Sequence, residues 1–187
     1  ASDSGTIDQL CRLKMAQWCF NVIDFIEFRR ETVSIAMSYL DRFLCSGSPR
    51  AEQVINCRKE YQLASMATLF MAIKINEPVI VDVTMLADLS KGLYTPKDFR
   101  QMEIDVLFAL NWRVNGPTAQ SFVAYLLTLM QQQMPNRPVH DLQKILDQAM
   151  YQIELSAGDY ELMTQKPSVI ATASILNCVE QTSAAIS

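Results

Sequence analysis

The sequence predicts an all-α protein. Half of its 187 residues are hydrophobic and 19% are charged, which is ample for a packed core and argues against disorder. Only 5 glycines occur, so long stretches contain no residue that breaks a helix. Apolar residues recur in these stretches at helical rather than strand spacing. We therefore expect a helical fold of one domain or two small ones.

The first predicted helix runs from about Asp8 to Phe28, with Thr6 or Asp8 as its N-cap. A second helix, ETVSIAMSYLDRFLC, follows the break at Arg29 and Arg30. Both show an apolar stripe at helical spacing. The inward positions are expected to be Leu10, Leu13, Trp18, Val22, Phe25 and Ile26 in the first helix, and Val33, Ala36, Met37, Leu40, Phe43 and Leu44 in the second.

The third predicted helix, at about 54–76, is apolar nearly all round, which is typical of a helix buried inside a protein. It follows the turn cluster SGSPR. Ala64, Thr68 and Ala72 are small residues at four-residue spacing, which lets neighbouring helices approach closely. Pro78 ends it. We expect this helix to be the centre of a bundle.

Two further helices complete the first domain, which we place at residues 1–112. VDVTMLADLS reads as a short helix capped by Asp82. The fifth helix begins with Thr95 as N-cap and Pro96 at the first helical position, and it should end near Asn111.

Residues 113–117 are expected to be a linker, because Gly116 and Pro117 break the helical pattern. Three helices are predicted in residues 118–187: AQSFVAYLLTLMQQQ, VHDLQKILDQAMYQIELSAG and KPSVIATASILNCVEQ. The last resembles the central helix when VIATASILNCVE is set over LASMATLFMAIK, with Glu180 in the place of Lys74. This indicates a partial second copy of one helical unit, cut short after three helices.

Four ionisable residues stand in strongly apolar or central positions: Arg12, Asp41, Lys74 and Glu103. A buried charge is tolerated only when it is paired and hydrogen-bonded. We expect Arg12 and Asp41 to form a structural ion pair between the first two helices, because a guanidinium matches a carboxylate. We expect Lys74 and Glu103 to face outward at one rim and to offer a donor and an acceptor to a partner. An ordinary solvated face is the alternative for each, and spacing alone does not reject it.

Composition disfavours several classes of function. The net charge is −4 and no Lys/Arg-rich block occurs, which argues against nucleic acid as a partner. No apolar run reaches the roughly 18 residues of a membrane span. The start has no signal-peptide pattern and no initiator methionine, so a cut or processed end is expected. The five cysteines, without a C-x-x-C, read as reduced thiols of an intracellular protein. His140 is the only histidine, so a zinc site or a Cys–His nucleophile has little support, and we expect no metal and no cofactor.

These residues resemble the cyclin family. Its cyclin box is a five-helix unit marked by an Arg in the first helix, an Asp in a YLDRFL-like second helix, a Leu and a Lys in the third and a Glu in the fifth. Here they stand, at similar separations, as Arg12, Asp41, Leu63, Lys74 and Glu103. The strings KINEP, YTPKDFRQMEIDVL, GPTAQSF and KPSVIATAS also fit. The resemblance covers Asp8 to about Gln181 and implies the cyclin fold.

The resemblance implies a regulatory and activating subunit of a cyclin-dependent Ser/Thr kinase in cell-cycle control, without catalysis of its own, in the nucleus or the cytoplasm. The matching Lys and Glu of the family hydrogen-bond kinase main chain near the first large helix of the kinase, which assigns this role to Lys74 and Glu103. The family positions that supply apolar contact around them are Met71, Ile75, Leu107 and Val114.

One family feature is degenerate here. Many cyclins bind substrates or inhibitors in a shallow apolar groove on the first helix, and Met15, Trp18 and Gln62 hold matching places. Lys14 stands where an apolar residue is usual, and Asn21 stands where a carboxylate receives the arginine of the substrate. We expect weak or altered docking of Arg-x-Leu peptides. Simple core packing is the alternative role of Trp18.

Two other functions are weighed against the kinase subunit. A cyclin-fold adaptor that binds a non-kinase, transcription-related partner generally lacks the Lys74–Glu103 pair, so its presence disfavours the adaptor. An enzyme built on a helical bundle would need clustered carboxylates with E-x-x-H spacing or a Cys–His arrangement, and the sequence has neither.

Overall fold

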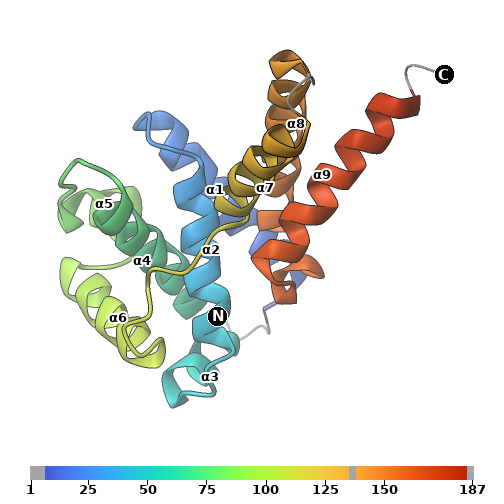
Figure 1. Cartoon of the computed structure of the whole chain (residues 1–187). Helices are drawn as coiled ribbons and strands as arrows, with labels where there is room; N and C mark the ends of the chain where they lie inside the picture. Colours follow the sequence, from blue (N-terminus) through green and yellow to red (C-terminus); the bar gives the residue numbers. More distant parts are fainter. Residues whose placement is uncertain (1–6, 135–137, 185–187) are drawn as a thin grey trace. The chain divides into compact units, whose positions relative to one another are not determined.

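The computed structural model describes residues 7–134 and 138–184, and every regular element in these ranges is helical (Figure 1). The predicted all-α class is therefore confirmed. The helices are α1 (Gln9–Phe25), α2 (Glu31–Leu44), α3 (Pro49–Ile55), α4 (Arg58–Asn76), α5 (Val83–Leu89), α6 (Pro96–Ala109), α7 (Ala119–Gln133), α8 (Val139–Gly158) and α9 (Pro167–Ala184), with a short 3₁₀ helix at Leu162–Thr164.

The chain forms two compact units. The first holds residues 1–116 together with the short segment 158–160, and the second holds 117–157 and 161–187. The division falls between Gly116 and Pro117, inside the stretch that we expected to be a linker.

Helix α1 begins where its cap predicts, but it buries a different face. Asp8 accepts a hydrogen bond from the Cys11 backbone N–H group at 2.8 Å, and Thr6 lies outside the described residues. Leu10 and Leu13 are more than half exposed and Phe25 is 84% exposed, so their prediction as inward residues is wrong. The buried face instead holds Arg12, Ala16, Cys19, Phe20, Val22 and Ile23. A stripe that includes an arginine and small residues is missed when only large apolar residues are followed.

The predicted central helix ends at Asn76 as expected, but it begins at Arg58 rather than near residue 54, because a separate short helix precedes it. Helix α3 begins at Pro49, because the Ser48 hydroxyl accepts a hydrogen bond from the Ala51 N–H group and Pro49 suits the first helical position. It ends at Ile55, where the Asn56 side chain bonds the Glu52 carbonyl oxygen. Among the described residues the first unit therefore holds six helices rather than five.

Helix α4 is the centre of the first unit. It contacts α1, α2, α3, α5 and α6, and most of its length is buried. The small residues Ala64, Thr68 and Ala72 are fully enclosed, as their spacing predicts. Buried hydroxyl groups are satisfied within the helix, since Thr68 Oγ1 donates to the Ser65 carbonyl oxygen at 3.0 Å. Burial of each large apolar side chain contributes about 1.5–3 kcal/mol to this core.

The starts of α5 and α6 follow local capping chemistry. The Asp82 carboxylate accepts from the Thr84 N–H group at 3.1 Å. Thr95 and Asp98 form a reciprocal capping box in front of Pro96. Hydrogen bonds from Thr95 hold the pKa of Asp98 below its usual value. The sequence predicts both caps because each depends only on residues within one helical turn.

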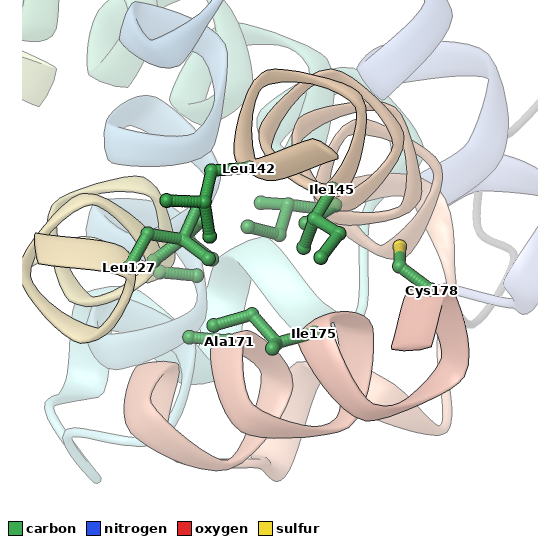
Figure 2. Close-up of a cluster of buried hydrophobic side chains, with 10 residues drawn as sticks. Leu127, Leu142, Ile145, Ala171, Ile175 and Cys178 are labelled. Carbon is green, nitrogen blue, oxygen red and sulfur yellow. The ribbon is translucent and has the colours of Figure 1, made fainter. Parts of the chain in front are cut away.

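The second unit packs α7, α8 and α9 around one apolar cluster (Figure 2). Leu127 of α7, Leu142 and Ile145 of α8, and Ile175 of α9 point toward one another there (Figure 2). Helix α9 is buried at the positions that correspond to one face of the central helix α4, and it is exposed at the positions that correspond to the other faces. Ser174 is buried like its counterpart Thr68, whereas Ala173 is exposed and its counterpart Ala67 is not. In this unit α9 is covered on a single face.

Candidate functional site

The structure joins Arg12 and Asp41 in a buried ion pair between α1 and α2. The Arg12 side chain is only 3% exposed. Its Nη1 atom pairs with Asp41 Oδ1, and its Nη2 atom lies 3.0 Å from Asp41 Oδ2. Its Nε atom donates to the Asp159 carbonyl oxygen at 3.1 Å. Burial raises the pKa of Asp41, and the hydrogen bonds and charge of Arg12 oppose that rise. The guanidinium thus links three segments of the first unit.

Lys74 and Glu103 also meet. Lys74 lies in the last turn of α4 and Glu103 lies in α6, and Nζ is 2.5 Å from Oε1. The Lys74 side chain is 42% exposed and that of Glu103 is 16% exposed. The ammonium also lies 4.9 Å from the centre of the Phe70 ring. A lysine has three N–H donors, so an ammonium engaged in one ion pair can still donate to another molecule.

The four apolar residues expected around this pair differ in their exposure. Ile75 presents a substantial apolar surface, and Leu107 and Val114 are partly buried. Met71 is only 1% exposed, so in this structure it lies in the core and presents no surface to a partner. Helix α4 is buried on nearly all sides from Leu63 to Ile73 and exposed only at its two ends, so the sequence pattern does not separate Met71 from an outward residue.

The end of α4 is held in place by a second set of polar contacts. Glu77 is nearly buried and accepts a hydrogen bond from the Thr32 hydroxyl. Arg29 lies with its Nε atom 3.7 Å from the Glu77 carboxylate, and its Nη2 atom donates to the Asn76 carbonyl oxygen. These bonds fix the helix end that carries Lys74, so Glu77 of the KINEP string supports the site from within.

The residues of the expected docking groove lie on two helices. Met15 and Trp18 of α1 and Gln62 of α4 are all partly buried. Gln62 Oε1 accepts a hydrogen bond from the Tyr94 hydroxyl at 3.2 Å.

The two residues at which this groove departs from the family are exposed. Lys14 and Asn21 both lie on α1, and Asn21 Oδ1 accepts from Gln17 Nε2 at 3.0 Å. The Gln17 and Asn21 side chains therefore form a neutral amide pair on the exposed face of α1.

Sequence reasoning missed one exposed feature of α6. Ile104 and Phe108 lie four residues apart on α6 and are 46% and 66% exposed. Trp112, in the turn that follows the helix, is 63% exposed. The buried face of the same helix is formed by Phe99, Met102 and Val106. Two apolar stripes on one helix are the signal that reveals a second, uncovered surface.

The described residues contain no group of three or more side chains that could hold a metal ion. All five cysteines lie in this part of the chain and are free thiols. Burial raises the pKa of the Cys19 thiol to about 12, which makes it an inert core residue. Within the same residues no helix is both long and apolar enough to cross a lipid bilayer.

Comparison with known proteins identifies the family. Residues 2–115 match the cyclin N-terminal domain and residues 117–183 match the cyclin C-terminal domain. The chain is 32% identical to Cyclin-A1-4 of Oryza sativa subsp. japonica, over 90% of this chain and 44% of that protein. It is 28% identical to the G1/S-specific cyclin-D2 of Rattus norvegicus, over 90% of this chain and 54% of that protein. The chain thus spans about half the length of the curated relatives it matches.

Solved structures share the fold. A viral cyclin from herpesvirus saimiri superimposes with a TM-score of 0.73 at 20% identity, over 95% of this chain and 72% of that one. A chain of the CAK complex from Chaetomium thermophilum bound to ATP-gamma-S superimposes with a TM-score of 0.60 at 12% identity, over 92% of this chain and 55% of that chain. The two domain matches cover nearly the whole sequence, and the marker residues lie together in the first unit. The chain belongs to the cyclin family.

Proposed function

We propose that this chain is a regulatory and activating subunit of a cyclin-dependent Ser/Thr kinase in cell-cycle control and has no catalytic activity of its own. The observation that carries the proposal is the Lys74–Glu103 pair at the surface between α4 and α6, beside the exposed Ile75. A few directed polar groups surrounded by apolar side chains are typical of an interface that binds one partner tightly. Its relatives include proteins named as G2/mitotic-specific and G1/S-specific cyclins, which supports the cell-cycle assignment.

The mechanism is a population shift in the kinase. A protein kinase is active when its β3 lysine pairs with a glutamate on its αC helix. A partner that binds the helix-in conformation better than the helix-out conformation activates the kinase by at most its difference in affinity. Lys74 and Glu103 would contribute to that difference by bonding main-chain groups near this helix.

A panel of purified cyclin-dependent kinases tests the function. We expect this chain to bind at least one of them and to raise its phosphorylation of histone. A folded protein that binds none of them would contradict the proposal. The alternative, a cyclin-fold adaptor for a transcription-related partner, would then be favoured. The Lys74–Glu103 pair argues against the adaptor, because such relatives generally lack it.

Peptide docking on α1 is expected to be weak. An Arg-x-Leu peptide would meet the Lys14 ammonium and the Asn21 amide, where relatives offer an apolar residue and a carboxylate. Loss of a hydrogen bond between charged groups costs about 1.5–3 kcal/mol. Titration of a labelled Arg-x-Leu peptide should show no binding at micromolar concentrations. The double change Lys14→Leu and Asn21→Glu should restore it, and micromolar binding to the unmodified chain would contradict the prediction.

A further inference from the structure

Thr95 is an exposed hydroxyl residue in a sequence context that some kinases recognise. The chain contains two hydroxyl residues followed by proline, Ser48-Pro49 and Thr95-Pro96. Proline-directed kinases phosphorylate serine or threonine in this context, and a proline also restricts the residue before it to an extended backbone. Thr95 has this backbone, with φ at −91° and ψ at 160°. An exposed and extended acceptor is the form in which a kinase binds its substrate.

The segment between α5 and α6 presents the Thr95 side chain to solvent. Lys91 and Gly92 turn the chain with φ values of 55° and 76°. The side chains beyond this turn alternate, because Leu93 is 45% exposed, Tyr94 is only 4% exposed and Thr95 is exposed again. The Thr95 hydroxyl therefore lies on the outer side of a short extended segment.

The Thr95 hydroxyl is also part of the capping box that starts α6. It donates to Asp98 Oδ2 at 2.8 Å and accepts from the Asp98 backbone N–H group at 3.3 Å. The same carboxylate oxygen accepts from the Thr95 backbone N–H group at 2.8 Å. A phosphate bonded to this hydroxyl oxygen would carry nearly two negative charges and would remove the donated proton. It would stand against the Asp98 carboxylate, so the capping box could not stay closed.

The other candidate, Ser48, lacks this coupling to a carboxylate. Its Oγ atom accepts from the Ala51 N–H group at 3.2 Å and from the Ser46 hydroxyl at 3.1 Å. Neither contact involves a charged group, and Ser48 is partly buried whereas Thr95 is exposed. Thr95 is thus the acceptor whose modification would change the structure around it.

We propose that Thr95 is a phosphorylation site for a proline-directed Ser/Thr kinase and that its phosphorylation opens the first turn of α6. The kinase transfers the γ-phosphoryl group of ATP to Thr95 Oγ1. The bond from the γ-phosphorus to its bridging oxygen breaks, ADP leaves, and the hydroxyl proton passes to the catalytic aspartate of the kinase. This inference goes beyond the proposed function and does not depend on the partner of the chain.

Two exposed lysines favour the opened, phosphorylated form. Lys97 lies two residues after Thr95, and Lys59 Nζ lies 5.9 Å from the centre of the neighbouring Tyr94 ring. Both side chains are long and end in an ammonium group, which bonds phosphate strongly. They offer the phosphate a partner once it has moved away from Asp98.

A phosphorylation assay on the full chain tests the acceptor. Two probe kinases are used in separate reactions with radiolabelled ATP: a mitogen-activated protein kinase, and a cyclin-dependent kinase activated by another cyclin. We expect phosphate at Thr95, located by mass spectrometry. Thr95→Asn should lose this label yet stay folded, because asparagine also caps a helix. Pro96→Ala should lose it too, whereas Thr95→Ser and the control Ser48→Ala should keep it.

Hydrogen exchange tests the opening of the helix start. The amide N–H groups of Asp98 and Phe99 bond the Thr95 carbonyl oxygen at 3.0 and 3.3 Å. Phosphorylation should accelerate their exchange at least about tenfold, because loss of an N-cap frays the first turn. Asp98→Asn keeps an acceptor for the Thr95 N–H group but has no charge. In this variant, phosphorylation should leave the exchange of both amides nearly unchanged.

Three results would overturn the inference. The first is no phosphate at Thr95 with either kinase, although both phosphorylate a Thr-Pro reference peptide. The second is phosphate at Thr95 with unaltered or slower exchange, since the capping box would then tolerate the modification. The third is equal acceleration in Asp98→Asn, which would remove the carboxylate from the mechanism. None of these results bears on the proposed function, and failure of the chain to bind any kinase of the panel would leave this inference intact.

Discussion

Kinase activation should be lost when Lys74 and Glu103 are both replaced by alanine, while the protein stays folded. Two hydrogen bonds from charged groups contribute about 1.5–3 kcal/mol each, so kinase binding should weaken by at least about 100-fold. Stability should fall by no more than about 1 kcal/mol, because an ion pair with an exposed lysine contributes little. Histone phosphorylation measures the loss of activation, and thermal unfolding of the same preparation measures the change in stability.

A charge swap separates a role in binding from a role in folding. Lys74→Glu combined with Glu103→Lys keeps an ion pair between α4 and α6 but exchanges the donor and the acceptor presented to the kinase. If the pair serves only to hold the two helices together, the swapped protein should activate the kinase normally. We expect it to fold and to fail in activation. Full activation by the swapped or the double-alanine protein would contradict the prediction.

Arg12→Ala should destabilise the first unit by about 3–5 kcal/mol, because it leaves Asp41 buried without its counter-ion. A typical domain is stable by only about 5–15 kcal/mol, so this is a large fraction of the total. It also removes the donor that bonds the Asp159 carbonyl oxygen. In urea unfolding the midpoint should fall while the slope of the transition stays the same.

The matched control is Arg30→Ala, which breaks the exposed pair between Arg30 and Asp24 and should cost less than about 1 kcal/mol. Replacement of both partners, Arg12→Met with Asp41→Leu, should recover most of the stability, because a buried ion pair and apolar residues of similar volume are often close in free energy. Equal destabilisation by Arg12→Ala and Arg30→Ala would contradict the prediction.

Local chemistry in this chain is predictable from sequence, whereas the choice of the buried helix face is not. The caps Asp82 and Thr95 were predicted because a cap involves neighbours along the chain. The sequence does not reveal the separate helix α3, because Ser48 and Pro49 suit a turn as well as a helix start. The face that α1 buries depends on how Arg12 meets Asp41, which requires the position of α2.

In the candidate site, too, the need for a partner is predictable from sequence, whereas the three-dimensional contact often is not. An arginine in an apolar helix requires a carboxylate partner, and Asp41 is that partner. That Lys74 and Glu103 engage each other depends on the distance between α4 and α6, which no local pattern encodes. Phe108 and Met71 are both apolar residues of helices, yet Phe108 is exposed and Met71 is buried. The difference depends on whether another helix packs against that face, and the residue type alone does not predict this.

The bond from Arg12 to Asp159 joins residues that are 147 positions apart. A ribosome that adds about 5–20 residues per second makes Arg12 roughly 7–30 s before it makes Asp159. During that interval the nascent first unit already contains α1 and α2 but lacks one acceptor for its buried cation. Its early helices therefore reach their final stability only after α8 has been translated.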